Sequence, residues 1–342
     1  MKRYDVTIGI PVYNSVDVIQ ESLLSALSQS FSCIEYLLVD DGCTDSTFEI
    51  VAQIINKHSK HDDVRIIKHH NNLGVSVSRN QIIDEAQGDY LYFMDSDDTI
   101  AENTIELLMK NVRKYDAEIV FGSYERIDIS GKKTIYQYPF IKLFGKDELA
   151  CYAYRKYAGI QASACNYLVK TLILRDNNLR FINTNYWEDF VFTFDLVTLI
   201  SRAVLLPDIT YSYICRENSL SHYQQRERIS KDEIMQNVYA IDYLKATSSL
   251  LYNKVYFPNR CFNIAMTDFY IICNVLKRRK DIYPKISDKE IKLMMVYPTS
   301  FFQVCRFRQS MFGNIVLYVI SILPSMLCVF MIKCIGKLKN SI

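Results

Sequence analysis

The stretch that decides the fold is VTIGIPVYN, at residues 6–14. It begins with a run rich in β-branched residues and continues into a polar segment from Pro11, which predicts a buried strand followed by a loop. Residues 17–28 then place apolar side chains at helical spacing, which predicts a helix directly after the strand. We therefore expect a strand–helix unit here.

The same order repeats as far as residue 98. Strands are predicted at residues 35–39, 64–68 and 90–94, and helices at 76–86 and at 45–57, where Asp45 is a natural N-cap. Such alternation indicates a parallel sheet with helices on both faces. Ligands bind such sheets beyond the carboxyl ends of the strands. We expect the three polar loops found there to converge, at residues 11–14, 40–45 and 95–98.

The rest of the chain has a different character. A further strand is predicted at residues 118–129, and Gly131 marks a hairpin turn into a second β-rich stretch. After Arg226 the segments become helical and rich in aromatic residues. We therefore predict a first domain at residues 1–225 and a helical C-terminal region at residues 226–342.

The composition is that of a folded protein with a sizeable core. Of its 342 residues, 49% are hydrophobic and 23% are charged, which excludes a disordered or collagen-like chain. The net charge of +2 argues against a strongly basic nucleic-acid-binding protein. The ten cysteines form no C-x-x-C pair or zinc-type cluster, so reduced cytosolic thiols are expected, and no secretory signal is predicted.

Carboxylates crowd the end of the fourth predicted strand, in the sequence Asp95-Ser96-Asp97-Asp98. A divalent cation, Mg²⁺ or Mn²⁺, shared with the phosphates of a substrate would relieve the repulsion between these acids. The alternative interpretation is a cap on the following amphipathic helix, because acids favour helix N-termini.

Two weaker signals lie in the same predicted crevice. Asp40-Asp41-Gly42 ends the second strand with carboxylates that can accept hydrogen bonds from a nucleobase or a ribose. Gly74 precedes a helix that carries Arg79 near its start, which makes Arg79 a candidate anion contact.

Together these motifs resemble those of a known family, the inverting glycosyltransferases of family 2. The motifs occur in the family's order and approximate spacing within residues 5–225, and they are Pro11-Val12-Tyr13-Asn14, Asp40-Asp41-Gly42-Cys43-Thr44-Asp45, Gly74-Val75-Ser76-Val77-Ser78-Arg79-Asn80, Asp95-Ser96-Asp97-Asp98 and Glu188-Asp189. The departures are small: Cys43 and Ser78 stand where Ser and Ala are usual. The resemblance implies the GT-A fold of nucleotide-diphospho-sugar transferases, a doubly wound mixed α/β sheet, here with a helical C-terminal extension.

The resemblance also implies roles for individual residues. Tyr13 and Asp41 look like contacts of a uracil base. The residues expected at the nucleotide sugar are Pro11, Tyr13, Asn14, Asp40, Asp41, Arg79 and Ser96. The expected ligands of the divalent metal, Mn²⁺ or Mg²⁺, are Asp95 and Asp97, with Asp98 an equal candidate. The catalytic pair is Asp189, in the position of the general base, and its neighbour Glu188.

These roles agree with the chemistry of sugar transfer. A bound cation offsets the charge on the departing diphosphate, and a carboxylate near the acceptor hydroxyl removes its proton during a single inverting displacement. Trp187, beside the expected base, either stacks on a sugar ring or packs in the core. Residues 219–222, Ser-Leu-Ser-His, either close over the diphosphate or form an ordinary surface loop.

Two other functions compete with sugar transfer. Residues 95–99 also fit the D-x-D-x-T motif of haloacid-dehalogenase-type phosphatases, in which Asp95 would be the nucleophile. That motif normally follows the first strand of its fold, whereas three strand–helix units precede it here. The second alternative is a catalytically inactive, membrane-associated scaffold, although the acid triplet and Asp189 are retained.

The C-terminal segment is apolar and basic. Residues 315–332 carry no charge and are interrupted by Pro324, and from Lys277 onward 12 Lys and Arg face only 3 Asp and Glu. The segment at residues 311–335 therefore either spans a membrane, lies in its interface or forms a buried core helix. Membrane contact is the favoured interpretation, because basic residues attract anionic headgroups.

The resemblance and this segment together suggest an acceptor. Similar proteins assemble bacterial capsule, exopolysaccharide and O-antigen, so we expect a glycan acceptor carried on a polyprenyl diphosphate lipid. The enzyme would then work at the cytoplasmic face of the cell membrane. A processive synthase is not expected, because the chain lacks the several spanning helices of an export channel.

Overall fold

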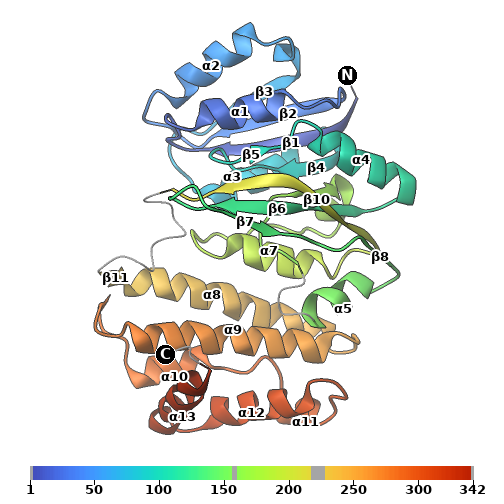
Figure 1. Cartoon of the computed structure of the whole chain (residues 1–342). Helices are drawn as coiled ribbons and strands as arrows, with labels where there is room; N and C mark the ends of the chain where they lie inside the picture. Colours follow the sequence, from blue (N-terminus) through green and yellow to red (C-terminus); the bar gives the residue numbers. More distant parts are fainter. Residues whose placement is uncertain (1–2, 156–159, 217–227, 340–342) are drawn as a thin grey trace. The chain divides into compact units, whose positions relative to one another are not determined.

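The computed structural model describes residues 3–155, 160–216 and 228–339 (Figure 1). The chain divides into two compact units. The first comprises residues 1–149 and 162–219, and the second comprises residues 150–161 and 220–342. The domain boundary predicted at residues 225 and 226 lies outside the described residues.

Four parallel strands form one half of the sheet in the first unit. They are β1 (Tyr4–Val12), β2 (Ile34–Asp40), β3 (Val64–Lys68) and β4 (Gly88–Phe93), and they lie in the order β3-β2-β1-β4. The helices between them are α1 (Ile19–Leu27), α2 (Thr47–Lys57) and α3 (Val75–Glu85), with the short helix η1 (His61–Asp63) before β3. Each strand and helix predicted up to residue 94 is present, so the strand–helix alternation is confirmed.

The strand order creates a switch point. The chain runs outward from β1 through β2 to β3 and then returns to place β4 on the other side of β1. In parallel sheets a switch point of this kind is where ligands are expected to bind, beyond the carboxyl ends of the two strands. The 11–14 segment spans the end of β1, and the 95–98 segment follows β4.

The other half of the sheet is mixed. It contains β5 (Thr99–Ile100), β6 (Ile119–Ile127), β7 (Lys133–Tyr136), β8 (Ile141–Phe144), β9 (Tyr167–Lys170) and β10 (Arg202–Ile214). β9 pairs antiparallel with β4 and β6, β10 runs parallel to β6, and β7 pairs antiparallel with β6 through the hairpin predicted at Gly131. The helices here are α4 (Thr104–Tyr115), α6 (Thr171–Asp176) and α7 (Glu188–Leu196), and α5 (Glu148–Arg155) leads into the second unit. The result is a ten-stranded mixed sheet, as expected for the GT-A fold.

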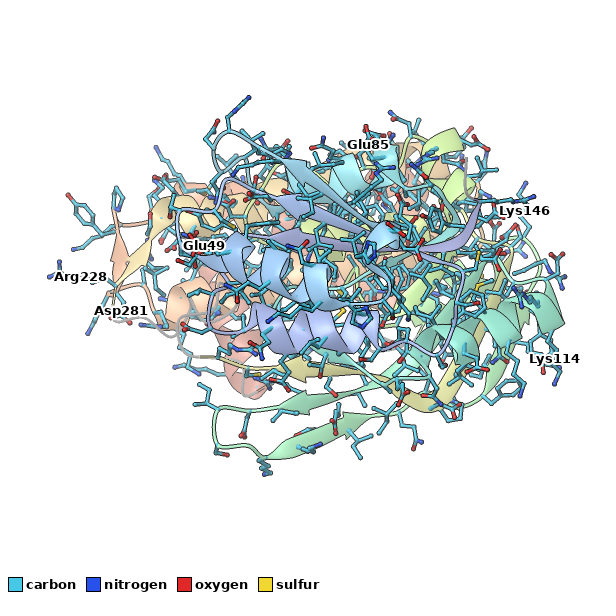
Figure 2. All side chains as sticks on the ribbon, turned by 90° about the horizontal axis from the view of Figure 1, so that it is seen from above. Glu49, Glu85, Lys114, Lys146, Arg228 and Asp281 are labelled. Carbon is cyan, nitrogen blue, oxygen red and sulfur yellow. The ribbon has the colours of Figure 1, made fainter. Side chains whose placement is uncertain are left out.

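The core of the first unit is tightly packed around β1. Every side chain of β2 is buried, and Gly9 in β1 lies so close to α3 that an added Cβ would meet Ile82 Cγ2 at 2.3 Å. Charged side chains such as Glu85, Lys114 and Lys146 instead project from the periphery of this unit (Figure 2). The helices are therefore held against the sheet by apolar contact over short distances.

The second unit is helical, as its sequence predicts. Its main helices are α8 (Lys231–Ser248) and α9 (Phe257–Lys277), which lie side by side (Figure 1). The shorter elements are η3 (Ser249–Leu251), α10 (Asp288–Met294), α11 (Phe301–Val304) and the parallel pair β11 (Ile229–Ser230) and β12 (Ile282–Tyr283). Ser230 and Glu233 form a capping box that starts α8.

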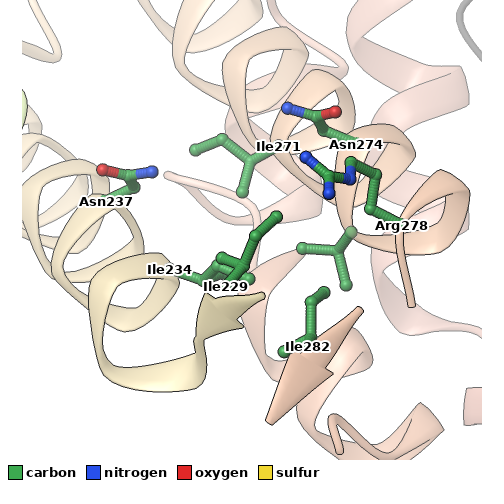
Figure 3. A pocket seen from close by; sticks show the side chains of 8 residues that line it. Ile229, Ile234, Asn237, Ile271, Asn274, Arg278 and Ile282 are labelled. Carbon is green, nitrogen blue, oxygen red and sulfur yellow. The ribbon is translucent and has the colours of Figure 1, made fainter. Parts of the chain in front are cut away.

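Two buried ionic groups anchor this unit. Arg260 is fully buried and donates to Ser248 Oγ at 2.8 Å and to Tyr154 Oη at 2.7 Å. Lys245 Nζ lies 2.8 Å from a carboxylate oxygen of the buried Asp268. Isoleucines from β11, β12, α8 and α9 also face a hollow of about 30 Å³ (Figure 3), which is large enough for a water molecule.

The apolar C-terminal segment forms two helices. α12 (Met311–Ile322) and α13 (Ser325–Leu338) are separated by Leu323 and Pro324, so the predicted interruption at Pro324 is confirmed. None of the helices in the described part of the chain combines the length and the hydropathy needed to cross a bilayer.

Candidate active site

Three of the loops quoted from the sequence meet at the carboxyl ends of β1, β2 and β4. Asn14 Oδ1 accepts a hydrogen bond of 2.8 Å from the backbone N–H of Thr44. The hydroxyls of Ser15 and Ser96 lie 2.8 Å apart, which joins the loop after β1 to the acid loop after β4. The convergence expected from the strand pattern is therefore present.

The loop after β2 is folded around Asp41. This carboxylate is buried and accepts hydrogen bonds of 2.9 Å from the N–H groups of Leu73 and Gly74, and a ring nitrogen of His69 lies 2.7 Å away. Gly42 has φ +73°, and an added Cβ there would lie 2.5 Å from the backbone of Asn71. Asp41 therefore holds the segment before α3 in place, and only glycine fits at position 42.

Asp40 and Cys43 complete this loop. Asp40 is buried and accepts a hydrogen bond of 2.8 Å from the Cys43 N–H, and Lys68 Nζ lies 3.5 Å away from its other oxygen. The Cys43 thiol receives a bond from the Asn14 N–H at 3.3 Å, and burial raises its pKa to about 12. Cys43 therefore stays a neutral thiol that fills the place of the usual serine.

The start of the site, at the end of β1, is partly exposed. Tyr13 exposes 45% of its surface, Asn14 has a left-handed backbone with φ 44°, and Pro11 is buried inside the strand. An exposed aromatic ring at a switch point has the shape needed to stack on a planar base. Pro11 supports the strand end rather than exposing a surface.

Arg79 joins two acidic motifs that are far apart in the sequence. Its guanidinium is buried and donates at 2.8 Å to Asp95 Oδ1 and at 2.8 Å to Glu188 Oε1. Because both terminal nitrogens of the guanidinium, Nη1 and Nη2, donate to carboxylates, Arg79 orients the two motifs toward each other. This position differs from the nucleotide contact expected for Arg79.

Asp98 is tied to β10. One of its oxygens accepts a 2.7 Å bond from the Tyr211 hydroxyl and the other accepts a 2.8 Å bond from the Ile214 N–H. Helix α4 begins only at Thr104, with Asn103 at its N-cap position, so the alternative that these acids cap a helix is wrong. Of the three acids considered as metal ligands, Asp98 has both oxygens committed within the protein.

Asp97 is the most accessible acid of the triplet. Its side chain is 39% exposed, and Arg216 donates to its backbone carbonyl and lies 3.6 Å from its carboxylate. Burial and the neighbouring Asp95 raise the pKa of Asp97 to about 6. This crowding of negative charge is the environment that a divalent cation relieves.

The acids fit a cation only in part. Within the described residues no group of three metal-ligating side chains occurs. Asp95 and Asp97 supply hard oxygen donors of the kind that Mg²⁺ and Mn²⁺ prefer, and Mg²⁺ usually takes one or two carboxylates together with substrate phosphates. The residues present therefore fit a cation that is held jointly with a diphosphate.

Helix α7 presents the second acid pair. Trp187 precedes it in a left-handed conformation with φ 66°, and its ring packs against Phe190 with centroids 5.3 Å apart. Glu188 is paired with Arg79, whereas Asp189 Oδ1 accepts a hydrogen bond of 2.7 Å from the N–H of Phe190. Burial and the adjacent Glu188 raise the pKa of Asp189 to about 7, the range in which a carboxylate can accept and release a proton near neutral pH.

Some residues of this site were not predicted. Tyr211 lies near the end of β10, Arg216 follows that strand, and His69 follows β3 beside Asp41. A histidine directly after a parallel strand is a detectable signal, because it falls at the same sheet edge. The positions of Tyr211 and Arg216 depend on the pairing of β10 with β5 and β6, which no local pattern reveals. The predicted loop at residues 219–222 lies outside the described residues.

Comparisons with known proteins agree on one family. The model of the family described as "Glycosyl transferase family 2" matches residues 7–170. An uncharacterized glycosyltransferase of Haemophilus influenzae is 27% identical over 267 residues, which are 78% of this chain and 93% of that protein. The succinoglycan biosynthesis protein ExoO of Rhizobium meliloti is 26% identical over 248 residues, 70% of each chain.

A solved structure shows the same fold. Residues 1–349 of TarS from S. aureus, crystallised in complex with UDP-GlcNAc, superimpose with a TM-score of 0.58. The match covers 92% of this chain and 90% of that one at 18% sequence identity. The likeness extends beyond the residues that the family model matches.

Proposed function

Since the chain is a glycosyltransferase that belongs to family 2, we propose that it moves a sugar from a nucleotide-diphosphate donor to a hydroxyl of a glycan acceptor, with inversion at the anomeric carbon. The observation that carries this proposal is the Arg79 bridge. It holds the acid loop after β4 and the acid pair of α7 on one guanidinium. A donor diphosphate and an acceptor hydroxyl would thus meet between the two motifs.

The donor is proposed to be a UDP-sugar. Tyr13 is exposed at the end of β1 and offers its ring to the base. Asn14, Asp40, Asp41 and Ser96 would shape the rest of the nucleotide pocket, chiefly by fixing the loops as described above. The TarS structure bound to UDP-GlcNAc supports a donor of this class.

We propose that Asp95 and Asp97 hold a divalent cation, Mn²⁺ or Mg²⁺, together with the donor's diphosphate. When bound, the cation supplies positive charge that offsets the charge on the leaving diphosphate. Asp98 is the weakest of the three candidate ligands, because Tyr211 and Ile214 already occupy its oxygens.

Asp189 is proposed as the general base. Its pKa of about 7 lets it remain partly ionised at neutral pH and still take the proton of an acceptor hydroxyl as the oxygen attacks the sugar. Glu188, on the same helix as Asp189, pairs with the guanidinium of Arg79 and is thus a positioning residue in this proposal. Trp187, partly exposed beside the base, is placed to pack on the acceptor or donor sugar.

The acceptor is proposed to be a growing surface polysaccharide, carried on a polyprenyl diphosphate lipid at the cytoplasmic face of the cell membrane. Similarity to the succinoglycan biosynthesis protein supports a polysaccharide product. Capsule, exopolysaccharide and O-antigen are products of this class. The C-terminal segment at residues 311–335 is the part of the chain that would bring the enzyme to such an acceptor.

The phosphatase alternative is not favoured. Its nucleophile would be Asp95, which follows the fourth strand of the sheet and is paired with Arg79. A scaffold without activity is also not favoured, since the fold places one acid of each motif, Asp95 and Glu188, on one arginine.

The test measures binding and hydrolysis of a UDP-sugar panel with and without Mn²⁺. We expect metal-dependent binding by the wild type, loss of binding in Asp97→Ala, and retained binding without turnover in Asp189→Asn. Asp116→Asn, at a side chain that is 95% exposed, serves as the matched control and should behave as the wild type. Hydrolysis of a generic phosphate ester that depends on Asp95, with no UDP-sugar bound, would overturn the proposal.

A further inference from the structure

The outer faces of α12 and α13 carry an unusual number of exposed apolar side chains. Phe312 is 81% exposed, Met326 78%, Phe330 60% and Leu338 85%. Phe302, on α11 beside α12, also belongs to this set and is 79% exposed. Figure 1 shows α11, α12 and α13 close together within the second unit. We call this set of side chains the C-terminal apolar face.

These helices differ from ordinary surface helices. α12 packs Asn314, Leu317 and Ile320 inward, where α9 lies against it, yet its twelve residues include no charged side chain to face water. α13 buries Cys328, Val329 and Ile332 on one side and exposes Met326 and Phe330 on the other. A helix that is apolar on both sides normally has a second apolar neighbour, so an exposed face of this kind indicates a docking surface.

Cations predominate around this face, although α10, which packs against α13, carries Asp288 and Glu290. The sequence contains no Asp or Glu after Glu290, whereas it contains six Lys and Arg there. The five of these cations that are exposed are Arg306, Arg308, Lys333, Lys337 and Lys339. A surface that combines apolar side chains with an excess of cations matches the anionic headgroups and acyl chains of a lipid bilayer.

The geometry limits how such helices contact a bilayer. At 1.5 Å per residue, the 14 residues of α13 extend about 21 Å, less than the roughly 30 Å of a hydrocarbon core. The break at Pro324 prevents α12 and α13 from joining into one longer helix. A second copy of the chain is a poor occupant, because a twofold contact would set cations against cations.

We propose that the C-terminal apolar face docks on an anionic lipid bilayer, with α12 and α13 lying in the interface. Phe312, Met326 and Phe330 insert among the acyl chains, and Lys333 and Lys337 meet the phosphates of the headgroups. This docking is independent of which sugar the enzyme transfers.

The test is sedimentation of the full-length protein with vesicles of phosphatidylcholine alone and with phosphatidylglycerol added. We expect binding that grows with the anionic lipid fraction and falls with added salt. The double variant Phe312→Ser/Phe330→Ser should bind at least about tenfold more weakly, because two inserted rings are removed. Lys333→Gln should weaken binding to the anionic vesicles by about fivefold.

Matched controls distinguish docking through the C-terminal apolar face from nonspecific binding of other exposed side chains to the vesicles. Leu250→Ser removes an 83% exposed leucine from η3, and Lys57→Gln removes an exposed lysine from α2; both should bind as the wild type. Circular dichroism must show that each variant is folded. Equal binding by wild type and the Phe312→Ser/Phe330→Ser variant would overturn the proposal. So would a dimer in solution that this variant converts to monomer without any change in vesicle binding.

Discussion

At the scale of single residues, Arg79 has the largest consequence. A buried guanidinium requires carboxylate partners, and it has one in the acid loop and one in α7. The reaction proposed here needs those two segments at a fixed separation, because one faces the diphosphate and the other the acceptor hydroxyl. We therefore expect Arg79 to link the stability of the first unit with the proposed reaction.

Replacing Arg79 tests that link. Arg79→Met leaves Asp95 and Glu188 without their cation, so we expect the free energy of unfolding to fall by about 3–5 kcal/mol. Arg79→Lys keeps the charge but not the two-pronged geometry, and its loss should be smaller. Urea denaturation measures both. Unchanged stability in Arg79→Met would contradict the role of the bridge.

Asp189 gives a pH prediction. Below its pKa of about 7 the carboxyl is protonated and cannot accept a proton, so the rate at saturating donor should rise tenfold per pH unit up to about pH 7 and then level off. Asp189→Asn should lower kcat by about 10²–10⁴-fold and abolish this rise. A rising limb that persists in Asp189→Asn would assign the titration to another group.

The sequence predicted which residues lie at the same edge of the sheet, but not which groups their side chains contact. Asp40, Asp41, Arg79 and Asp95 come together because they follow strands of one parallel sheet, and the strand pattern is local. Whether a carboxylate faces a ligand or a protein N–H depends on partners that are distant in the chain. Asp98 illustrates this, since its partner Tyr211 is 113 residues away.

At the scale of elements, the turn after β2 depends on a glycine. Gly42→Ala places a methyl group 2.5 Å from the backbone of Asn71 and strains a φ of +73°. We expect a loss of about 1–3 kcal/mol in stability and weaker UDP-sugar binding, because the 71–74 segment must shift. Thermal unfolding and donor titration measure the two effects.

Gly131→Ala is the control for that prediction. Gly131 has φ +81° but nothing lies within 4 Å of an added Cβ. The substitution should therefore cost only the backbone strain, about 1–2 kcal/mol, and leave donor affinity unchanged. If both alanine variants bind the donor as the wild type does, the Asn71 contact is unimportant for the site.

The attachment of β10 to the acid loop gives a further prediction. Tyr211→Phe removes the hydroxyl that donates to Asp98 and should lower stability by about 1–2 kcal/mol and raise KM for the donor. Tyr90→Phe removes a comparable 2.9 Å bond to the Ala117 carbonyl and should leave KM unchanged. Steady-state kinetics on both variants distinguishes a local effect from a general one.

Among the elements, the first four strands and their helices were predictable because each strand is a short apolar run and each helix has apolar residues at helical spacing. β5, β8 and β9 are short, and their pairings join segments that no local pattern connects. The strand pairings in the mixed half of the sheet could therefore be assigned only from the structure. The hairpin at Gly131 was the exception, because its turn residue is visible in the sequence.

At the scale of the whole molecule, the chain divides between a sheet unit that holds the candidate active site and a helical unit. The helical unit depends on the buried pair Lys245 and Asp268. Lys245→Met should lower its stability by about 3–5 kcal/mol, because Asp268 is left without its cation. Hydrogen exchange of the α8 and α9 amides measures this loss where it occurs.

A second substitution should reverse that effect. Lys245→Met/Asp268→Leu removes both charges and leaves apolar groups of similar volume, so most of the lost stability should return. Persisting instability in the double variant would show that the pair does more than neutralise buried charge.

The Arg79 bridge also constrains the order in which the protein can be made. Asp95 follows Arg79 by 16 residues, but Glu188 follows it by 109. During translation, α3 can therefore leave the ribosome before Glu188, one of the two carboxylate partners of Arg79, has been synthesised. We expect the Arg79 guanidinium to stay partly hydrated until α7 has been added. The parallel half of the sheet can form early, but the candidate active site can be completed only after nearly the whole first unit has left the ribosome.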